Sequence, residues 1–411
     1  MGTAGDKGRT KGTAAMTSAT GAMGEPCANG GRIDVSVVVP CYNTERFLDQ
    51  ALSSIEANDR CSLEVIVLND GSTDGSLAIM RAHEAADARI RVIDKANQGY
   101  GATVNRGFAE ARGTYLAIVE PDDWVEPHMY DDLVDYARTF SPGLDPATAP
   151  DVVKTPYWRI WMPETPKERR YNCSYRYRIA QGLAQPFTLH DEPRLVMHHP
   201  SIWSALYRRG FIEESGIRFH ELPGAGWVDN PFLFDTLCRA RRIVYLDTPY
   251  YCYREDLPGS SSARRVASLS FERWNDMADV VEGLGVTDQG ILRALCVIGF
   301  RYIGASLGEG ALESPELTEM IRAICRRMDP EAVRGCANVS PKMKAFVLEM
   351  AGRSTDGLSP WPYRRALVDE FFYSARNNGL GFALSRLGIF LRRHAAEHGL
   401  ADPTTTRSAS I

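Results

Sequence analysis

Three carboxylates stand directly after an apolar run in the first third of the chain. The unbroken run from Tyr115 to Val119 predicts a strand buried on both faces, and Glu120, Asp122 and Asp123 follow it. Packed carboxylates repel one another and must stay hydrated, so they seldom end a strand for the sake of stability. At the carboxyl end of a parallel strand they can hold Mg²⁺ or Mn²⁺ against a substrate phosphate. A solvated loop with a turn at Pro121 is the alternative.

Strand and helix patterns alternate around these acids. The short connections between them predict a parallel sheet covered by helices. The expected strands are residues 33–39, 64–68, 90–93 and 115–119, and the expected helices follow them at about 47–55, 76–86, 100–112 and 127–139.

Each expected strand ends in a polar turn. The turns contain Tyr42–Asn43, Asn69–Asp70, Asn97 and the three acids. Because ligands of open α/β sheets bind along the carboxyl edge of the strands, four turns at this edge predict a binding site.

Two common nucleotide-binding patterns are missing. A dinucleotide-binding glycine fingerprint should follow the first strand, where Pro40–Asn43 stands instead. Gly99 and Gly101 begin such a pattern, but Val104 occupies the place of its third glycine. No Walker lysine loop occurs either, so both classes are unlikely from the sequence.

Composition limits the function further. The chain has 411 residues, a formal net charge of −5, 44% hydrophobic and 24% charged residues. These values predict a soluble globular protein of two folded units and give no electrostatic reason to expect nucleic acid. Nine cysteines without a Cys-x-x-Cys pair favour reduced thiols in the cytoplasm. No apolar stretch is expected to span a bilayer, and residues 1–31 predict a disordered leader.

Taken in order, the polar turns and one later segment resemble the family 2 glycosyltransferases of the GT-A fold. The resemblance covers roughly residues 33–255 and implies a Rossmann-like α/β domain, mostly parallel, with helices on both faces of the sheet. The matching segments are Val35–Asn43, Asn69–Asp74, Asn97–Gly99 with Asn105–Gly107, Glu120–Asp123 and Trp227–Asn230.

The resemblance also implies roles for single residues. Asp122 corresponds to the acid that binds Mn²⁺ or Mg²⁺, with Asp123 beside it as a second metal ligand. Glu120 stands where the family usually has aspartate, and Val104 where it often has arginine. The residues assigned to the nucleotide sugar are Pro40 and Tyr42 at the nucleobase, Asp70 at the base or ribose, and Asn43, Asn97, Glu120 and Asp122.

Transfer to a hydroxyl requires a base, and Asp229 is the candidate. It stands in the glycine loop 224–232 that opens a helix, so a helix cap is its alternative role. The implied activity is metal-dependent, inverting transfer from a nucleotide-diphosphate sugar, with UDP favoured, to a glycan or lipid-linked acceptor in cell-surface polysaccharide synthesis. A catalytically silent nucleotide- or glycan-binding protein is the alternative that Glu120 and Val104 leave open. A sugar-1-phosphate nucleotidyltransferase would need a glycine- and lysine-rich loop that this chain lacks.

The extent of the resemblance, and a change to helical spacing of the apolar residues after it, suggest the domain boundaries. We expect the GT-A domain at residues 32–259, with a nucleotide-binding half at about 32–140 and an acceptor half at about 150–259. A helical domain at 260–398 and a flexible tail at 399–411 follow.

Several segments outside the motifs have two interpretations. The aromatic segment 155–186 either shapes the acceptor site or packs in the core, and the pair His198–His199 has no partner at a metal-ligand spacing. Arg254 with Ser260–Ser262 forms either a lid over the diphosphate or an ordinary linker. Residues 380–394 predict a basic amphipathic helix that rests on an anionic membrane or, more commonly, packs against its own domain.

Overall fold

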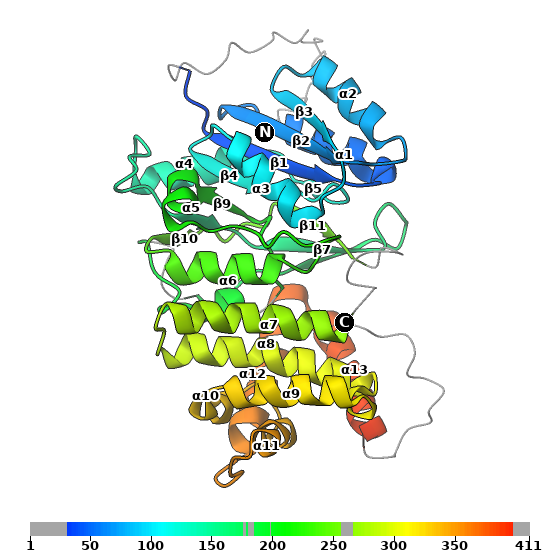
Figure 1. Cartoon of the computed structure of the whole chain (residues 1–411), viewed down its shortest axis with the longest axis vertical. Helices are drawn as coiled ribbons and strands as arrows, with labels where there is room; N and C mark the ends of the chain where they lie inside the picture. Colours follow the sequence, from blue (N-terminus) through cyan, green and yellow to red (C-terminus); the bar gives the residue numbers. More distant parts are fainter. Residues whose placement is uncertain (1–30, 176–177, 180–184, 198, 256–265, 398–411) are drawn as a thin grey trace, which may run out of the picture.

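A seven-stranded sheet forms the upper part of the molecule in Figure 1. The computed structural model describes residues 31–175, 178–179, 185–197, 199–255 and 266–397, so the expected leader and tail lie outside the described residues. The sheet order is β10-β6-β9-β4-β1-β2-β3. Its strands are β1 (Val35–Cys41), β2 (Leu63–Asp70), β3 (Ile90–Lys95), β4 (Tyr115–Ile118), β6 (Val152–Lys154), β9 (Ala205–Arg208) and β10 (Ile243–Tyr245).

The predicted alternation of strands and helices is confirmed. All residues of β1, β2 and β4 are buried, as their continuous apolar runs require. β1 runs parallel to β2 and β4, and β2 runs parallel to β3, whereas β9 runs antiparallel to both β4 and β6. The helices of this part are α1 (Glu45–Glu56), α2 (Ser76–Ala86), α3 (Tyr100–Glu110), α4 (Met129–Phe140), α5 (Arg209–Ser215) and α6 (Asp229–Arg239).

One helix begins later than the sequence predicts. We expected the fourth helix to start at Pro127, with this proline in its first turn. Instead, α4 starts at Met129, because His128 before it adopts a left-handed backbone conformation with φ of 64°.

A second, four-stranded sheet has the order β5-β11-β7-β8 and was not predicted. It consists of β5 (Trp124–Val125), β7 (Tyr157–Trp161), β8 (Arg169–Asn172) and β11 (Tyr251–Arg254). Because β4 belongs to the first sheet and β5 to the second, the acidic turn 120–123 connects the two sheets. β11 pairs with β5, so the end of the α/β region packs against the acidic turn.

The C-terminal third is helical, as predicted, and lies at the bottom of Figure 1. α6 packs on α7, and one continuous apolar cluster extends from β1 to α11, so the helices share the core of the α/β part. The helices are α7 (Ala267–Gly283), α8 (Gln289–Gly308), α9 (Pro315–Arg327), α10 (Pro330–Gly335), α11 (Pro341–Met350), α12 (Trp361–Asn378) and α13 (Leu380–Glu397).

α8 corrects one expectation. Contrary to the prediction that no apolar stretch is long enough, its 20 residues are long and apolar enough to cross a membrane by length and composition. In the structure, 56% of its apolar window is buried inside the protein, as in the core helix of a globular domain. Length and composition therefore give only weak evidence for a membrane span here.

Candidate functional site

Glu120 follows β4 and lies against the start of α3. The hydroxyl of Tyr100 donates a hydrogen bond of 2.6 Å to Oε1 of Glu120. Burial raises the pKa of Glu120 to about 8; the bond from Tyr100 opposes this rise, and the charges of Asp122 and Asp229 add to it. The structure thus brings together the acidic turn and the predicted base, which are separated by more than 100 residues.

Asp122 is the central acid of the turn and is partly exposed. Burial raises its pKa, while the positive charge of Arg254 lowers it. The structure shows its carboxylate in the same acidic cluster as Glu120, consistent with the predicted role of metal ligand.

Asp123 is buried and has two strong partners. Its Oδ1 accepts a hydrogen bond of 2.7 Å from the backbone N–H of Arg254, and its Oδ2 accepts one of 3.0 Å from the hydroxyl of Tyr251. The same hydroxyl oxygen accepts from the backbone N–H of Glu120 at 3.0 Å. These contacts fix the acidic turn to β11, so Asp123 holds the shape of the turn. Its predicted second role, as a metal ligand beside Asp122, has no direct support in these contacts.

Asp229 begins α6 and does not cap it. Val228 occupies the N-cap position, so Asp229 is the first residue of the helix and not its N-cap. Burial raises the pKa of Asp229 to about 6, and hydrogen bonds from Asn230 partly oppose this rise. A carboxylate with a pKa near 6 can accept a proton at neutral pH better than an ordinary aspartate, whose pKa is lower.

The N-terminus of α3 is packed tightly against the segment before Asp229. A Cβ at Gly101 would lie 2.0 Å from the carbonyl oxygen of His220, and one at Gly99 would lie 2.2 Å from that of Leu222. Only glycine allows this approach, which is why a short glycine pattern occurs here without a dinucleotide fingerprint. Asn105 fixes the same segment, because its side chain bonds both the N–H and the carbonyl of Phe219 at 3.0 and 2.9 Å.

Asp70 shapes the loop at the end of β3. Its two oxygens accept hydrogen bonds from the backbone N–H groups of Gln98 and Gly99, at 2.8 and 3.0 Å, and it pairs with Lys95. The side chain of Asn97 donates to the carbonyl of Asp70 at 2.9 Å. The expected contacts of Asp70 and Asn97 with the nucleotide stay predictions; in the structure both residues build the edge of the site.

The turn after β1 carries the other predicted nucleotide contacts. Asn43 has a left-handed backbone, and its Oδ1 accepts from the N–H of Thr73 at 2.8 Å, which joins the first two polar turns. Pro40 is buried in β1, and Tyr42 is 52% exposed. Of these three residues, Tyr42 offers a free aromatic face on which a nucleobase can stack.

The carboxylates of Glu120 and Asp122 suit a divalent cation. They are hard oxygen donors, and the mutual repulsion that raises the pKa of Glu120 falls when a cation lies among them. A second group, Asp59, His128 and Asp131, has donor atoms within 4.8 Å of one another. Asp131 there already accepts from the backbone N–H groups of Arg60 and Cys61, and it pairs with the Arg60 guanidinium, whose charge opposes a cation.

Arg254 is a buried structural residue, so its interpretation as a lid over the diphosphate is wrong. Only 4% of it is exposed, and its guanidinium lies 4.7 Å from the ring centre of Phe47 and 4.9 Å from that of Trp124. It donates to the carbonyl of Asp122 at 2.8 Å and to Glu164 at 3.0 Å. Ser260–Ser262 lie outside the described residues.

An aromatic cluster lies behind the acidic turn. Trp203 stacks on Tyr251 with ring centres 4.0 Å apart and on Tyr253 at 5.5 Å, and Tyr157 meets Trp203 edge-on at 4.8 Å. Burial lowers the pKa of His199 beside them to about 3, so this histidine stays neutral. Core packing is therefore the role of Tyr157, while His198 lies outside the described residues.

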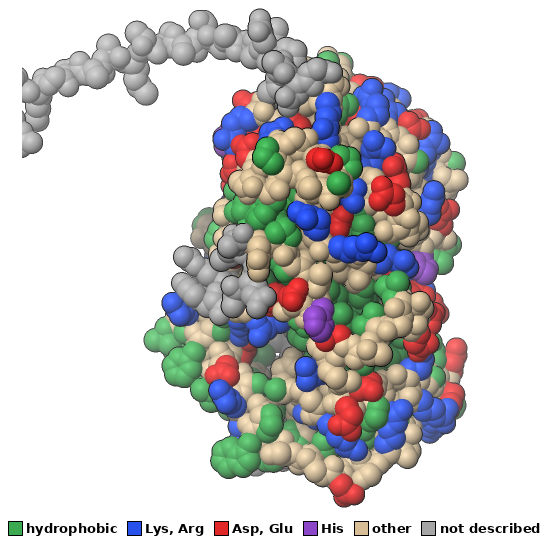
Figure 2. Space-filling view, turned by 90° about the vertical axis from the view of Figure 1, so that its left-hand side faces the viewer, with side chains coloured by type: hydrophobic (Ala, Val, Ile, Leu, Met, Phe, Trp, Pro, Cys, Tyr) green, Lys and Arg blue, Asp and Glu red, His purple; other side chains and the backbone are tan. Residues whose placement is uncertain are grey.

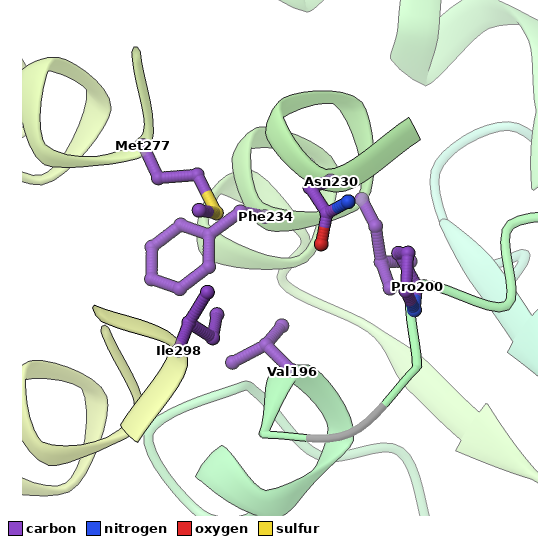
Figure 3. A pocket seen from close by; sticks show the side chains of 7 residues that line it. Val196, Pro200, Asn230, Phe234, Met277 and Ile298 are labelled. Carbon is purple, nitrogen blue, oxygen red and sulfur yellow. The ribbon is translucent and has the colours of Figure 1, made fainter. Parts of the chain in front are cut away.

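A small hollow links α6 to the helical part of the molecule. Figure 3 shows Asn230, which neighbours the predicted base, among apolar side chains. The Nδ2 of Asn230 lies 3.3 Å from Oδ1 of Asp229. The hollow is lined by Val196, Pro200, Asn230, Leu233, Phe234, Met277 and Ile298.

Tyr100, Tyr251 and Arg254 contact the acids, and the sequence analysis did not assign these contacts. Tyr100 directly follows the motif segment Asn97–Gly99, and this position is the sequence feature that could have identified it as a site residue. Tyr251 and Arg254 are more than 120 residues from Asp123, and no local pattern connects them to it.

The mostly parallel sheet and this acidic edge have the arrangement of the GT-A fold. Residues 36–214, less than half of the chain, match the family described as glycosyl transferase family 2.

Curated relatives agree with this family. The chain is 30% identical over 227 residues to the uncharacterized glycosyltransferase EpsJ of Bacillus subtilis, over 54% of this chain and 61% of that one. It is 31% identical over 251 residues to the putative glycosyltransferase EpsH of the same organism, over 58% of this chain and 65% of that one. The matches thus span less than two thirds of either relative.

The solved structure of S. aureus TarS 1-349 has a similar fold. The TM-score is 0.60 at 19% sequence identity, and the match covers 81% of this chain and 92% of that one. At this identity, the similarity shows the fold alone.

Proposed function

We propose that this protein transfers a sugar from a nucleotide-diphosphate sugar to an acceptor hydroxyl with inversion at the anomeric carbon. The observation that carries the proposal is the acidic turn after β4, in which Tyr100 holds Glu120 at 2.6 Å and Glu120 interacts electrostatically with Asp122 and Asp229. A TarS structure in complex with UDP-GlcNAc, which has a similar fold, supports a UDP-sugar as donor.

Asp229 takes the proton in the proposed reaction. Its carboxylate accepts the proton of the acceptor hydroxyl while the hydroxyl oxygen bonds to the anomeric carbon. The bond between that carbon and the diphosphate breaks, and the electron pair leaves with the nucleoside diphosphate. Because attack and departure take place on opposite faces of the sugar, the configuration inverts.

Asp122 holds the divalent cation in this proposal, either Mn²⁺ or Mg²⁺. When bound, the cation neutralises the charge that develops on the leaving diphosphate. Asp123 keeps the turn in place through Tyr251 and Arg254, and Tyr100 orients Glu120. Tyr42 stacks on the nucleobase, and the loop held by Asp70 closes the edge of the pocket.

The place of the reaction is part of the proposal. The proposed enzyme is cytoplasmic and acts on a glycan or lipid-linked acceptor in the synthesis of a cell-surface polysaccharide, as the family resemblance implies.

The substitution Asp229→Asn tests the assignment of the base. The amide keeps the size and polarity of the side chain but cannot accept the proton. We expect transfer to fall by about 10²-fold or more, while the Kd for UDP changes less than about threefold. Sugar transfer is measured with radiolabelled UDP-sugars, and binding is measured by calorimetry. Equal loss of both would contradict the role of Asp229, and binding without transfer in the unmodified protein would favour the catalytically silent alternative.

A further inference from the structure

The hairpin of α12 and α13 exposes large apolar side chains. Eleven large hydrophobic side chains are exposed in the described part of the chain, and seven of them belong to these two helices. Trp361 is 70% exposed and Phe372 is 66% exposed. Apolar groups this dense on a surface mark an interaction site. The seven are Trp361, Val368, Phe372, Leu380, Leu384, Leu387 and Leu391.

These side chains form stripes along the helices. Leu380, Leu384, Leu387 and Leu391 follow one another at intervals of four, three and four residues, which places them on one face of α13. Trp361, Val368 and Phe372 on α12 are seven and four residues apart and therefore also share a face. In Figure 2, hydrophobic side chains protrude at the lower left of the molecule, with basic side chains among them.

The stripes are not the faces by which the helices pack on the protein. On α13, Ala383 is fully buried, and the ring of Phe382 lies 4.6 Å from that of Tyr171 in β8. On α12, the side chain of Asn377 donates to the carbonyl of Asn172 at 2.8 Å, and Ser374 is buried. The hairpin is thus already docked through its other face.

The charge of the hairpin is opposite to that of the whole chain. Residues 361–397 contain six arginines, no lysine and three acids, a balance of +3, whereas the chain carries −5. Arg364 and Arg365 begin α12, and Arg392 and Arg393 lie near the end of α13. Because a tight turn at Gly379 joins the two helices, both arginine pairs belong to the same end of the hairpin. This arrangement is complementary to an anionic surface.

We propose that the α12–α13 hairpin binds an anionic lipid surface. The apolar stretch Leu380–Leu391 is too short to span a bilayer, so it lies in the interface with its leucines towards the acyl chains. Exposed tryptophan and phenylalanine beside arginine are typical of helices at this depth. Residues 398–411 contain only two large apolar side chains, Leu400 and Ile411, too few to cover seven.

A second copy of this chain is the rival occupant, because leucines at intervals of four and three also occur in coiled-coil seams. The positive balance of the hairpin disfavours it, since two copies would bring like charges together.

Vesicle sedimentation with the full chain tests the proposal. We expect binding to vesicles of phosphatidylcholine with phosphatidylglycerol, and at least about tenfold weaker binding to phosphatidylcholine alone. The double substitution Leu384→Gln and Leu387→Gln should reduce binding to the anionic vesicles by at least about tenfold. Leu312→Gln, at an exposed leucine outside the hairpin, is the matched control and should bind as the unmodified chain does. Circular dichroism establishes that each variant is folded.

Two results would overturn the proposal. One is a folded chain that sediments with neither kind of vesicle. The other is a stable dimer in light scattering that the Leu384 and Leu387 substitutions dissociate, because the stripe would then be covered by a second copy. Neither result bears on sugar transfer, which is measured separately with soluble acceptors.

Discussion

Burial decides how the carboxylates of the site can act. Burial raises the pKa values of Asp229 and Glu120, and for Glu120 the charges of Asp122 and Asp229 add to the rise. Asp123 lies in the same turn, but both its oxygens are bonded to β11. Neighbouring acids in one motif therefore have different tasks, set by their hydrogen-bond partners.

The raised pKa of Asp229 predicts the pH dependence of transfer. The folded pKa of about 6 lies above the ordinary value of 3.8, and only the ionised form can accept the acceptor proton. Transfer should therefore be near its maximum above about pH 7 and fall as the pH decreases through about 6, about tenfold per unit below it. Burial raises this pKa and hydrogen bonds from Asn230 partly oppose the rise, while Glu120 and Tyr100 are the titratable groups that interact electrostatically with this carboxylate.

The measurement is kcat/KM between pH 5 and 8 with the unmodified chain. Nucleotide binding over the same range controls for loss of the donor. A profile that is flat through pH 6 would argue against Asp229 as the base.

At the scale of elements, local patterns predicted the parallel strands but not the second sheet. β1, β2 and β4 are mostly apolar and fully buried, and a polar turn stands at the carboxyl end of each. β5 has two residues and pairs with β11, so that Trp124 faces Cys252 across more than 120 residues of chain. Strands this short have no periodicity, and their pairing depends on the whole fold.

The strand pattern predicted which polar turns lie at the carboxyl edge of the sheet. It could not predict the hydrogen bonds that these turns make with one another. Asp70, Asn97 and Asn43 were predicted to touch the nucleotide, whereas their visible bonds join one turn to the next. These bonds depend on side-chain geometry, which spacing along the chain does not determine.

Because α3 lies very close to residues 219–224, we expect substitution of Gly101 to lower both stability and activity. In Gly101→Ala the new Cβ would meet the carbonyl oxygen of His220 at 2.0 Å, so α3 must move away from the segment that leads to Asp229. We expect a loss of about 1–3 kcal/mol in the free energy of unfolding and a larger loss of transfer than of nucleotide binding. Urea denaturation and the transfer assay measure the two effects.

Gly143→Ala is the control for this substitution, because a Cβ at Gly143 has nothing within 4 Å. It should change stability by less than about 0.5 kcal/mol. Equal stability of the two variants would show that the contact between α3 and His220 is not tight.

At the scale of the whole molecule, the helical third completes the core of the α/β part. α6, which begins with the predicted base, packs on α7, and Ile298 of α8 reaches the hollow beside Asn230. The sequence predicted a separate helical domain from the change of period, but periodicity cannot show whether two units share one core.

A shared core predicts cooperative unfolding. Ile298 is 3% exposed, and Ile298→Ala should cost about 2–5 kcal/mol in a single transition. Far-UV circular dichroism and tryptophan fluorescence should give coincident urea midpoints in both the unmodified chain and the variant. Two separated transitions would instead support a helical domain that folds independently.

The most direct test of the central claim is calorimetric titration of UDP with and without Mn²⁺. We expect UDP to bind the unmodified chain at least about tenfold more tightly with Mn²⁺ than without it, and Asp122→Ala to abolish this difference while the protein stays folded. GDP and CDP in the same titration establish the choice of nucleobase. If no nucleotide binds a demonstrably folded chain, or if Asp122→Ala leaves the metal dependence unchanged, the acidic turn is not the donor site.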